Sequence, residues 1–432
     1  MGRSQLTENG EYKVSENLSG MQSEIENFDG WKKKAILFLS SQNTSLFGSM
    51  LVQYAIIWHV TLTTGSGTTL TVLTIASFLP QILISLFAGV WADRYDRKFL
   101  IITSDALTAL STLMLAIFFL VGYKELWLIF LVSGIRSFGA GIQMPAVGAL
   151  LPQIVPTEKL IKVNSINGTI MPVIMIASPV ISGAMLSLSR LELIFFVDVI
   201  TAAIAVGLLL MLKVPALQRS AESLEESGLS DLRAGLDYIR NHKTVKTLFV
   251  FFGFTFFLVT PVAFLTPLLV TRSFGTEVWR LTANEVTFFG GSILGGIVMT
   301  AWGGFSNRFR TIGLSCMIWA ALFTGLGLSK EFVIYLVFMT LAGIPMPFFN
   351  ASAITLLQEM VKPEMQGRVF GVQQLITNIV MPAGMLIFGP LSDYVTIELL
   401  LIVTSVFMAI PGIWIFFNKN AMQPQTDVSF SE

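Results

Sequence analysis

Three ionisable side chains lie within long apolar stretches of the sequence, namely Asp105, Arg136 and Asp198. A buried carboxyl group can hold a proton at neutral pH, because loss of water disfavours its charged form. An arginine in such a stretch stays charged and must face water or a carboxylate. We therefore expect Arg136 and Asp198 to take part in proton coupling, followed by Asp105. The structural alternatives are that Asp198 bonds a neighbouring helix and that Asp105 caps a helix or pairs with nearby arginines.

Uncharged polar side chains form a second group of candidates. The run 40–45 places six polar residues in a row within an otherwise apolar segment, which indicates a face on water. We expect this segment to line a central cavity, with an additional apolar lining of phenylalanine and methionine. Packing in the core or against lipid is the alternative for most of these side chains. The candidate cavity residues are Gln42, Asn43, Gln53, Gln143 and Asn350.

A short charged turn separates two of the apolar runs. It contains Asp93, Arg94, Arg97 and Lys98, and Gly89 precedes it. We expect Gly89 to let two helices approach closely, because it has no side chain. We expect Asp93 to lie at the positive N-terminus of a helix and the basic residues to pair across a gap on that side. The turn would then act as a gate, the alternative being a plain positively charged turn.

The sequence lacks the patterns of several other function classes. Its one cysteine, Cys316, lies in an apolar run and its two histidines are far apart, so we expect no disulfide framework and no metal site. No glycine is followed by lysine, which excludes a phosphate-binding loop of the ATPase type. The net charge is zero and the isoelectric point about 6.8, which gives no sign of nucleic-acid binding. We expect no cofactor and no enzymatic activity.

The composition is that of a membrane protein. Of the 432 residues, 53% are hydrophobic and only 12% are charged, and the mean hydropathy is +0.73. Soluble domains carry about 25% charged residues, so this chain has too few to cover a surface in water. Long uncharged runs recur, each of a length that crosses roughly 30 Å of hydrocarbon.

Only helices satisfy the backbone of such runs in lipid. We therefore predict an all-α membrane protein with twelve transmembrane helices in two pseudo-symmetric six-helix halves. The predicted spans are 35–60, 68–90, 99–122, 126–151, 165–188, 191–212, 245–271, 284–304, 311–329, 332–357, 371–392 and 396–417. The predicted divisions are a tail at 1–34, halves at 35–213 and 245–417, a linker at 214–244 and a tail at 418–432.

The linker contains a predicted amphipathic helix. Leu229, Leu232, Leu236 and Ile239 follow helical spacing there, so we expect a short helix lying on the membrane surface.

The distribution of basic residues predicts the orientation of the chain. With the N-terminus in the cytoplasm, 21 lysines and arginines fall in inside segments and 5 in outside loops, while Arg136 lies within a span. Positive charge favours the inside. We therefore expect a multi-pass protein of the plasma membrane with both termini cytoplasmic.

The two predicted halves resemble one another at two places. The charged turn recurs 214 residues later, with Asn307 and Arg308 where the first copy has Asp93 and Arg94. Because Asn307 lacks a charge, we expect the two gates to differ. A second match joins 150–163 to a segment 206 residues later. Duplicated halves of this kind place a substrate site between them.

Three stretches carry a resemblance to a known family. The stretch 89–100 resembles the signature G-x-x-x-D-R-x-x-R-K, and 135–141 resembles R-x-x-Q-G but lacks its glutamine. The stretch 178–183, with Pro179 and Gly183, is similar to the antiporter signature G-P-x-x-G-G, with serine at two glycine positions. Through these motifs residues 35–417 resemble the major facilitator superfamily, and within it the twelve-span drug-efflux group that includes the macrolide-efflux proteins.

The resemblance implies a secondary transporter. It would export a lipophilic drug-like compound, of the macrolide type, by alternating access as a proton antiporter. Its partners would be the small substrate, protons and the lipid bilayer, and it would act as a monomer. The alternatives are export of an endogenous metabolite such as a siderophore, lipid flipping, and a membrane sensor or enzyme that keeps the fold without transport.

Overall fold

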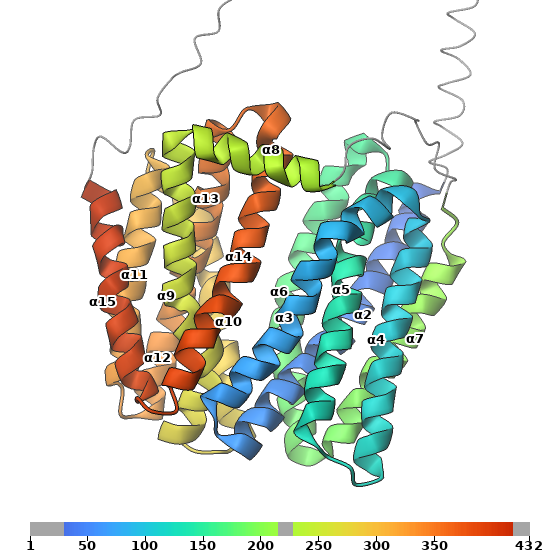
Figure 1. Ribbon diagram of the computed structural model, residues 1–432, viewed down its shortest axis with the longest axis horizontal. Helices are drawn as coiled ribbons and strands as arrows, with labels where there is room; N and C mark the ends of the chain where they lie inside the picture. Colours follow the sequence, from blue (N-terminus) through green and yellow to red (C-terminus); the bar gives the residue numbers. More distant parts are fainter. Residues whose placement is uncertain (1–29, 215–227, 418–432) are drawn as a thin grey trace, which may run out of the picture.

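The computed structural model describes residues 30–214 and 228–417, and within these ranges all regular structure is helical (Figure 1). The helices are α2 (Trp31–Thr64), α3 (Gly67–Arg94), α4 (Arg97–Leu120), α5 (Leu126–Ile154), α6 (Thr157–Leu188), α7 (Leu191–Met211), α8 (Gly228–Asn241), α9 (Lys243–Ser273), α10 (Val278–Trp302), α11 (Arg308–Leu328), α12 (Phe332–Gly343), α13 (Pro345–Met360), α14 (Pro363–Leu391) and α15 (Ile397–Phe417). The predicted tails at 1–34 and 418–432 lie almost wholly outside the described residues.

Twelve segments are long and apolar enough to cross a membrane, with α12 and α13 together forming one of them. The predicted all-α fold with twelve spans is therefore confirmed. Figure 1 shows two bundles side by side, α2–α7 and α9–α15, which we call the N-half and the C-half. The first helix of the N-half begins and the last helix of the C-half ends on the same side of the molecule. We call this the terminus side, and the opposite one the far side.

Several helices extend further than the hydropathy of the sequence predicts. Helix α6 begins at Thr157 and not at 165, α14 begins at Pro363 and not at 371, and α10 begins at Val278 and not at 284. Hydropathy marks only the part of a helix that lies in hydrocarbon. Polar residues continue each of these helices beyond that part, and for α10 the difference affects the site described below.

The linker helix α8 forms as predicted and packs against the C-half. It packs on α14, where Asp231 accepts a 2.6 Å hydrogen bond from Nε of Arg368. Gly235 lies directly against the carbonyl oxygen of Arg368, and Ile239 is buried. Leu236 is 48% exposed. Gly235 therefore allows the close approach to α14, and Leu236 is left uncovered by the rest of the protein.

Small residues allow the closest helix contacts of the C-half. A Cβ atom on Gly291 of α10 would lie 1.8 Å from the carbonyl oxygen of Thr340, and one on Gly295 would lie 2.2 Å from that of Ile344. Glycines four residues apart let two helices pack backbone to backbone. The same place is where the tenth span breaks, between Gly343 and Pro345. The helix breaks here because proline cannot continue the hydrogen bonds of the preceding turn.

We predict that Gly291→Val destabilises the protein by about 1–3 kcal/mol, because the new side chain overlaps the α12 backbone. The adjacent Gly290→Val is the matched control, since a Cβ atom there meets no other atom within 4 Å. Thermal unfolding of the two purified variants in detergent measures the difference. Equal melting temperatures for both would show that the close contact of α10 with α12 is absent.

Candidate functional site

An ion pair lies buried in the centre of the N-half. Nη1 of Arg136 on α5 contacts the Asp198 carboxylate on α7 and the Thr112 hydroxyl on α4. Nη2 also donates to the backbone oxygen of Ser49 on α2, at 3.3 Å. Both charged side chains are at least nine-tenths buried. Arg136 thus faces a carboxylate and not lipid, as expected for a charged side chain within a membrane span. Its contacts join four helices of the N-half, α2, α4, α5 and α7.

A second acid lies in the same half but has no basic partner among its contacts. Asp105 on α4 is 2% exposed, and its Oδ1 accepts hydrogen bonds from Ser45 at 2.6 Å and from Gln143 at 2.9 Å. Its Oδ2 is buried without a hydrogen-bond partner within the described structure. Gln143 also donates weakly to Gln42, at 3.4 Å. A carboxylate with one dry and unpartnered oxygen is well suited to hold a proton there.

The sequence of α5 explains why these groups meet. Arg136, Gly139 and Gln143 follow one another at intervals of three and four residues, so they share one helix face. A Cβ atom on Gly139 would lie 2.7 Å from the Thr108 hydroxyl and 3.3 Å from the Ser104 carbonyl oxygen of α4. Gly139 therefore lets α5 approach α4 closely enough for Arg136 to reach Thr112 and for Gln143 to reach Asp105.

The other predicted cavity residues have separate places. Asn43 on α2 donates to the carbonyl oxygen of Leu39 at 2.8 Å and to Oδ1 of Asn167 on α6 at 3.1 Å. Gln53 is partly exposed, and Asn350 is exposed on α13 in the C-half. Within the described residues, neither Gln53 nor Asn350 hydrogen-bonds to Asp105 or to the Arg136–Asp198 pair. Of the predicted cavity residues, only Gln42 and Gln143 are therefore linked by hydrogen bonds to a predicted acid.

One acid at membrane depth was not among the predicted site residues. Glu285 is the eighth residue of α10, about 10 Å from the start of that helix at 1.5 Å per residue. It was missed because the span was predicted to begin at 284, which placed Glu285 at the membrane surface. Nδ2 of Asn284 donates to its Oε1 at 3.2 Å, and the Tyr335 hydroxyl donates to Oδ1 of Asn284 at 2.7 Å. A longer hydropathy window would have found this residue.

The antiporter-like stretch of α6 lies where the halves meet. Pro179 and Gly183 are buried, and the Ser182 hydroxyl donates to the backbone oxygen of Leu51 at 3.0 Å. A Cβ atom on Gly183 would lie 2.0 Å from the Thr282 hydroxyl of α10. Only glycine fits at this crossing between the N-half and the C-half. Serine fits at 182 because its hydroxyl finds an acceptor on the neighbouring helix.

The terminus-side turn differs from its prediction. Asp96, not Asp93, caps a helix, since it accepts from the backbone N–H of Phe99 at 2.8 Å. Asp93 is exposed and lies 3.7 Å from Arg97. The space beside Gly89 is open, because a Cβ atom added to this glycine would meet no other atom within 4 Å. The predicted close approach of two helices at Gly89 is therefore wrong.

Two basic residues of this turn, Arg97 and Lys98, bond within their own half. Arg97 donates to the carbonyl oxygens of Ala92 and Ala149, both at 3.0 Å, and Lys98 donates to Leu212 at 2.8 Å. They therefore do not bridge the two halves in this structure. Arg94 also has an interaction partner, so it is not free.

The corresponding turn of the C-half shows which residues are equivalent. Asn307 caps α11 by accepting from the N–H of Phe309 at 3.0 Å, and Arg308 donates to the Gly303 carbonyl oxygen at 3.0 Å. In the N-half, Asp96 likewise caps a helix, through the N–H group three residues on, and Arg97 likewise donates to the carbonyl oxygen five residues before it. Asn307 thus corresponds to Asp96, and the alignment of Asn307 with Asp93 was displaced by three residues.

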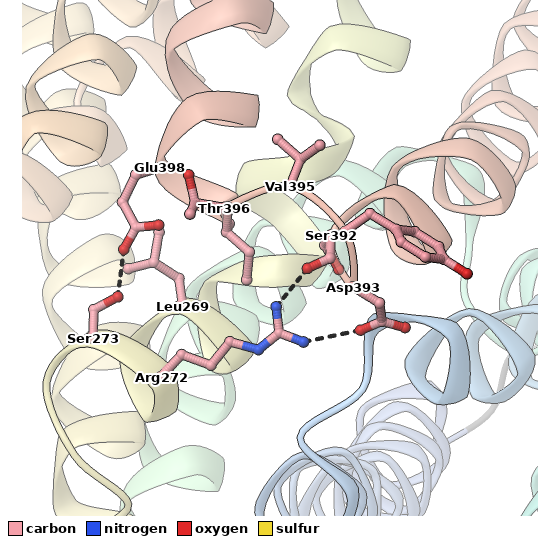
Figure 2. Close-up of a pocket in the computed structure, with 10 residues that line it drawn as sticks. Leu269, Arg272, Ser273, Ser392, Asp393, Val395, Thr396 and Glu398 are labelled. Atoms are coloured by element: carbon pink, nitrogen blue, oxygen red, sulfur yellow. Dashed lines mark hydrogen bonds and ion pairs between the residues drawn. The ribbon is translucent and has the colours of Figure 1, made fainter.

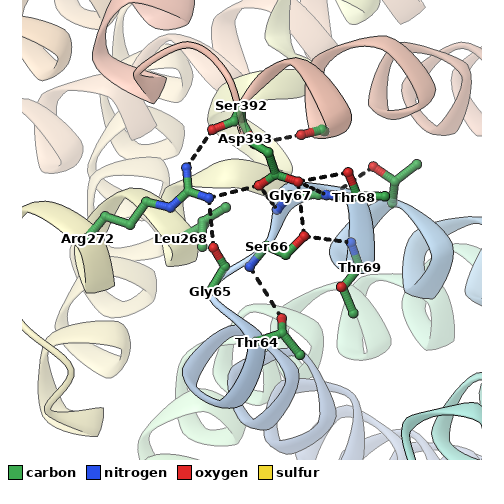
Figure 3. Close-up of polar contacts among 12 residues, drawn as sticks. Thr64, Gly65, Ser66, Gly67, Thr68, Thr69, Leu268, Arg272, Ser392 and Asp393 are labelled. Carbon is green, nitrogen blue, oxygen red and sulfur yellow. Dashed lines mark hydrogen bonds and ion pairs between the residues drawn. The ribbon is translucent and has the colours of Figure 1, made fainter.

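A polar cluster on the far side joins the two halves (Figure 3). Asp393, between α14 and α15, accepts from the backbone N–H groups of Gly67 at 2.7 Å and Thr68 at 2.9 Å, at the first turn of α3. The hydroxyls of Ser66 and Thr68 donate to it as well. A carboxylate is favoured at this helix end by the helix dipole. We call Asp393, Arg272 and residues 65–68 the far-side latch.

Arg272 of α9 completes the far-side latch. Its Nη2 lies 2.9 Å from Oδ1 of Asp393 and donates to the carbonyl oxygen of Gly65 at 2.7 Å, while Nη1 donates to the carbonyl oxygen of Ser392 (Figure 3). A pocket of about 350 Å³ opens beside it, with Glu398 on its wall (Figure 2). The far side is therefore closed in this structure, and opening it requires these bonds to break.

The latch stays charged over the physiological pH range. Partial burial raises the pKa of Asp393, but the hydrogen bonds from the N–H groups of Thr68 and Gly67 outweigh this and hold the pKa well below its usual range. A lowered pKa stabilises the closed state above the usual aspartate pKa of about 3.9 and loses this effect only in stronger acid. No local pattern in the sequence signals the latch, because 326 residues separate Asp393 from Gly67 and 121 separate it from Arg272.

The chain belongs to the Major Facilitator Superfamily, whose family profile matches residues 37–380 and 279–429. It is therefore a multi-pass membrane transporter of that family and not an enzyme. It is 29% identical over 378 residues to macrolide efflux protein A of Streptococcus pyogenes, covering 87% of this chain and 93% of that protein. It is 29% identical over 317 residues to macrolide efflux protein A of Enterococcus faecalis, covering 72% and 98%.

A solved structure shares the fold. A bacterial homologue of the human lysosomal transporter Spinster, in an inward-facing and unoccupied conformation, superposes with a TM-score of 0.70 at 15% sequence identity. The match covers 91% of this chain and 98% of that one. At this low identity the similarity concerns the arrangement of the helices.

We predict that Arg136→Met and Asp198→Leu each lower the free energy of unfolding by about 3–5 kcal/mol, because each leaves its partner buried with an uncompensated charge. The double variant, which removes both charges, should recover most of that loss. Thermal unfolding of the three purified variants measures the coupling. Losses that simply add in the double variant would contradict a direct ion pair.

We predict that Asp393→Ala shifts the equilibrium toward an open far side by about 1–2 kcal/mol, or about 5- to 30-fold, because it removes the acceptor at the α3 terminus. Spin labels at the exposed positions Thr63 and Lys330 report the distance between the halves there. The neighbouring Tyr394→Ala, at a side chain that is 90% exposed, should leave that distance unchanged. An unchanged distance in both variants would refute the latch.

Proposed function

We propose that this transporter exports a lipophilic drug-like compound of the macrolide type, by alternating access and in exchange for protons. The observation that supports this most strongly is the 29% identity to macrolide efflux protein A over 87% of the chain. The substrate site lies between the halves near the middle of the membrane, as duplicated halves of this fold imply. The protein works as a monomer.

The proposed orientation places both termini in the cytoplasm of the cell. It is supported by the 21 basic residues of the inside segments against 5 in the outside loops. The far side is then the outer face of the plasma membrane. The far-side latch holds the outer face shut, and the conformation described here accepts its substrate from the cytoplasm.

Asp105 is the proposed proton site, ahead of the Arg136–Asp198 pair that the sequence favoured. The carboxylate of Asp198 already has a buried cation beside it, which balances its negative charge. Asp105 has no such partner among its contacts, and its Oδ2 is buried and unpartnered. A proton on Oδ2 removes a buried charge at little structural cost, because both hydrogen bonds from Ser45 and Gln143 end on Oδ1.

Protonation of Asp105 would change how three helices hold together. Ser45 lies on α2 and Gln143 on α5, and both donate to the acid on α4. Hydrogen bonds to a charged carboxylate are roughly twice as strong as those to a neutral one. Loss of the proton therefore tightens the packing of α2 and α5 on α4, and its return loosens it. This is how a proton on Asp105 can bias the position of the N-half.

We predict that Asp105→Asn abolishes the proton-driven uptake of erythromycin into everted membrane vesicles, reducing it to the level of vesicles without the protein. Asparagine keeps the shape and the acceptor oxygen but cannot carry the proton. The matched control is Asp96→Asn, the same substitution at the exposed cap of the same helix, where asparagine caps equally well.

Erythromycin binding to the purified Asp105→Asn variant should stay close to that of the unmodified protein. Uptake in that variant that still responds to the pH gradient would refute Asp105 as the proton site. Uptake in the unmodified protein that ignores the gradient would refute proton exchange altogether. Cells without the protein that keep their erythromycin resistance but accumulate an endogenous metabolite would instead favour metabolite export.

A further inference from the structure

The linker helix α8 packs beside α14 near the edge of the apolar part of that helix. A Cβ atom on Gly235 would lie 2.8 Å from the carbonyl oxygen of Arg368 and 3.0 Å from the Val372 side chain of α14. The hydropathy of the sequence places the start of the hydrocarbon on α14 at 371, so these two contacts fall on either side of that boundary. Figure 1 shows α8 lying crosswise to the spanning helices on the terminus side. The helix α8 therefore lies in the plane of the membrane, in the layer of the lipid headgroups.

The two faces of α8 differ in chemistry. Gly235 and the buried Ile239 belong to the face that packs on the C-half. Arg233, Leu236 and Arg240 follow one another at intervals of three and four residues, so they share the opposite face. All three of these side chains are exposed. The uncovered face of α8 therefore combines two cationic side chains with an apolar one.

The two arginines of this face lack a counter-charge within the described structure. Among residues 30–214 and 228–417, the side chains of Arg233 and Arg240 take part in no ion pair or hydrogen bond. Asp237 is exposed on the same helix but lies within ion-pair distance of neither. Lys243 and Lys246, exposed at the start of α9, add two positive charges. This surface therefore carries a net positive charge. We call Arg233, Leu236, Arg240, Lys243 and Lys246 the α8 patch.

Other arginines of the terminus side are satisfied by the protein itself. Arg97 and Arg308 donate to backbone carbonyl oxygens, and Arg368 pairs with an aspartate of α8. These contacts hold the side chains in place and leave them little capacity for a ligand. Arg233 and Arg240 keep the five N–H donors of each guanidinium group for groups outside the protein. A guanidinium group binds a phosphate through two parallel hydrogen bonds.

We propose that the α8 patch binds the headgroup of an anionic phospholipid, with its phosphate against Arg233 and Arg240 and its acyl chains beside Leu236. A lipid fits better than a free phosphate ion, because an exposed leucine at this level gains from an apolar partner. In the proposed orientation the patch faces the cytoplasmic leaflet, whose surface is negatively charged. Because α8 also contacts α3 of the N-half, the bound lipid anchors the helix that joins the two halves.

Native mass spectrometry of the full-length protein in a neutral detergent tests the proposal, because it resolves each bound lipid. The probe is dioctanoyl phosphatidylglycerol. The double variant Arg233→Gln/Arg240→Gln should raise the Kd of the first bound lipid about 10- to 30-fold, because each basic residue near an anionic headgroup contributes roughly a fivefold step. The variant Arg233→Lys/Arg240→Lys, which keeps both charges, should recover most of the affinity.

Two controls separate the α8 patch from general charge attraction. Lys159→Gln/Lys162→Gln removes two exposed charges from the terminus side of α6 and should leave the Kd unchanged. Dioctanoyl phosphatidylcholine has the same chains but no net charge, so it should bind the unmodified protein and the glutamine variant of the two arginines equally weakly.

An unchanged Kd for phosphatidylglycerol in Arg233→Gln/Arg240→Gln, or an equal loss in the lysine control, would overturn the proposal. Inorganic phosphate that displaces the lipid at equal concentration would make the patch a site for a free anion instead. A dimer that is lost in the arginine variant, with lipid binding unchanged, would make it an interface between two copies of the chain. The assay measures no transport, so its result is independent of whether the protein exports erythromycin.

Discussion

The cost of a charge in hydrocarbon governs the whole arrangement, and the Arg136–Asp198 pair shows how the protein meets it. The pair is buried, and its contacts come from α2, α4, α5 and α7, which all belong to the N-half. Asp105 likewise takes its hydrogen bonds from helices of that half. Because the partners of these buried groups all lie within one bundle, the N-half can move against the C-half without breaking these contacts.

The contacts between the halves are of a different kind. At the far side they are the polar bonds of the latch, which lie at the surface where water can replace them. Deeper in the membrane they are close approaches of small residues, such as Gly183 against Thr282, which carry no charge. The strong interactions therefore lie inside each half, and those between the halves are weak or replaceable. Such a protein can alternate between a state closed at one end and a state closed at the other.

The sequence predicted those parts of the structure that follow from local composition. Twelve spans, the linker helix and the depth of Arg136 result from hydropathy and charge, which are read residue by residue. The partners of Arg136 and Asp105 could not be assigned, because they depend on how glycines such as Gly139 set helix distances. Glu285 was missed because the start of α10 was predicted six residues too late. The latch was missed because its residues are far apart in the sequence. The turn at 89–98 misled because a family signature gives residue types but not their contacts.

The proposed mechanism requires exchange of the substrate for protons. This exchange can be measured in proteoliposomes that have an acidic lumen and contain a trapped pH indicator. Adding erythromycin outside vesicles whose protein has its terminus side outward should raise the lumenal pH faster than in protein-free liposomes, as protons leave in exchange for the incoming drug. Erythromycin that accumulates through the protein with no pH change beyond that of the protein-free liposomes would refute the exchange.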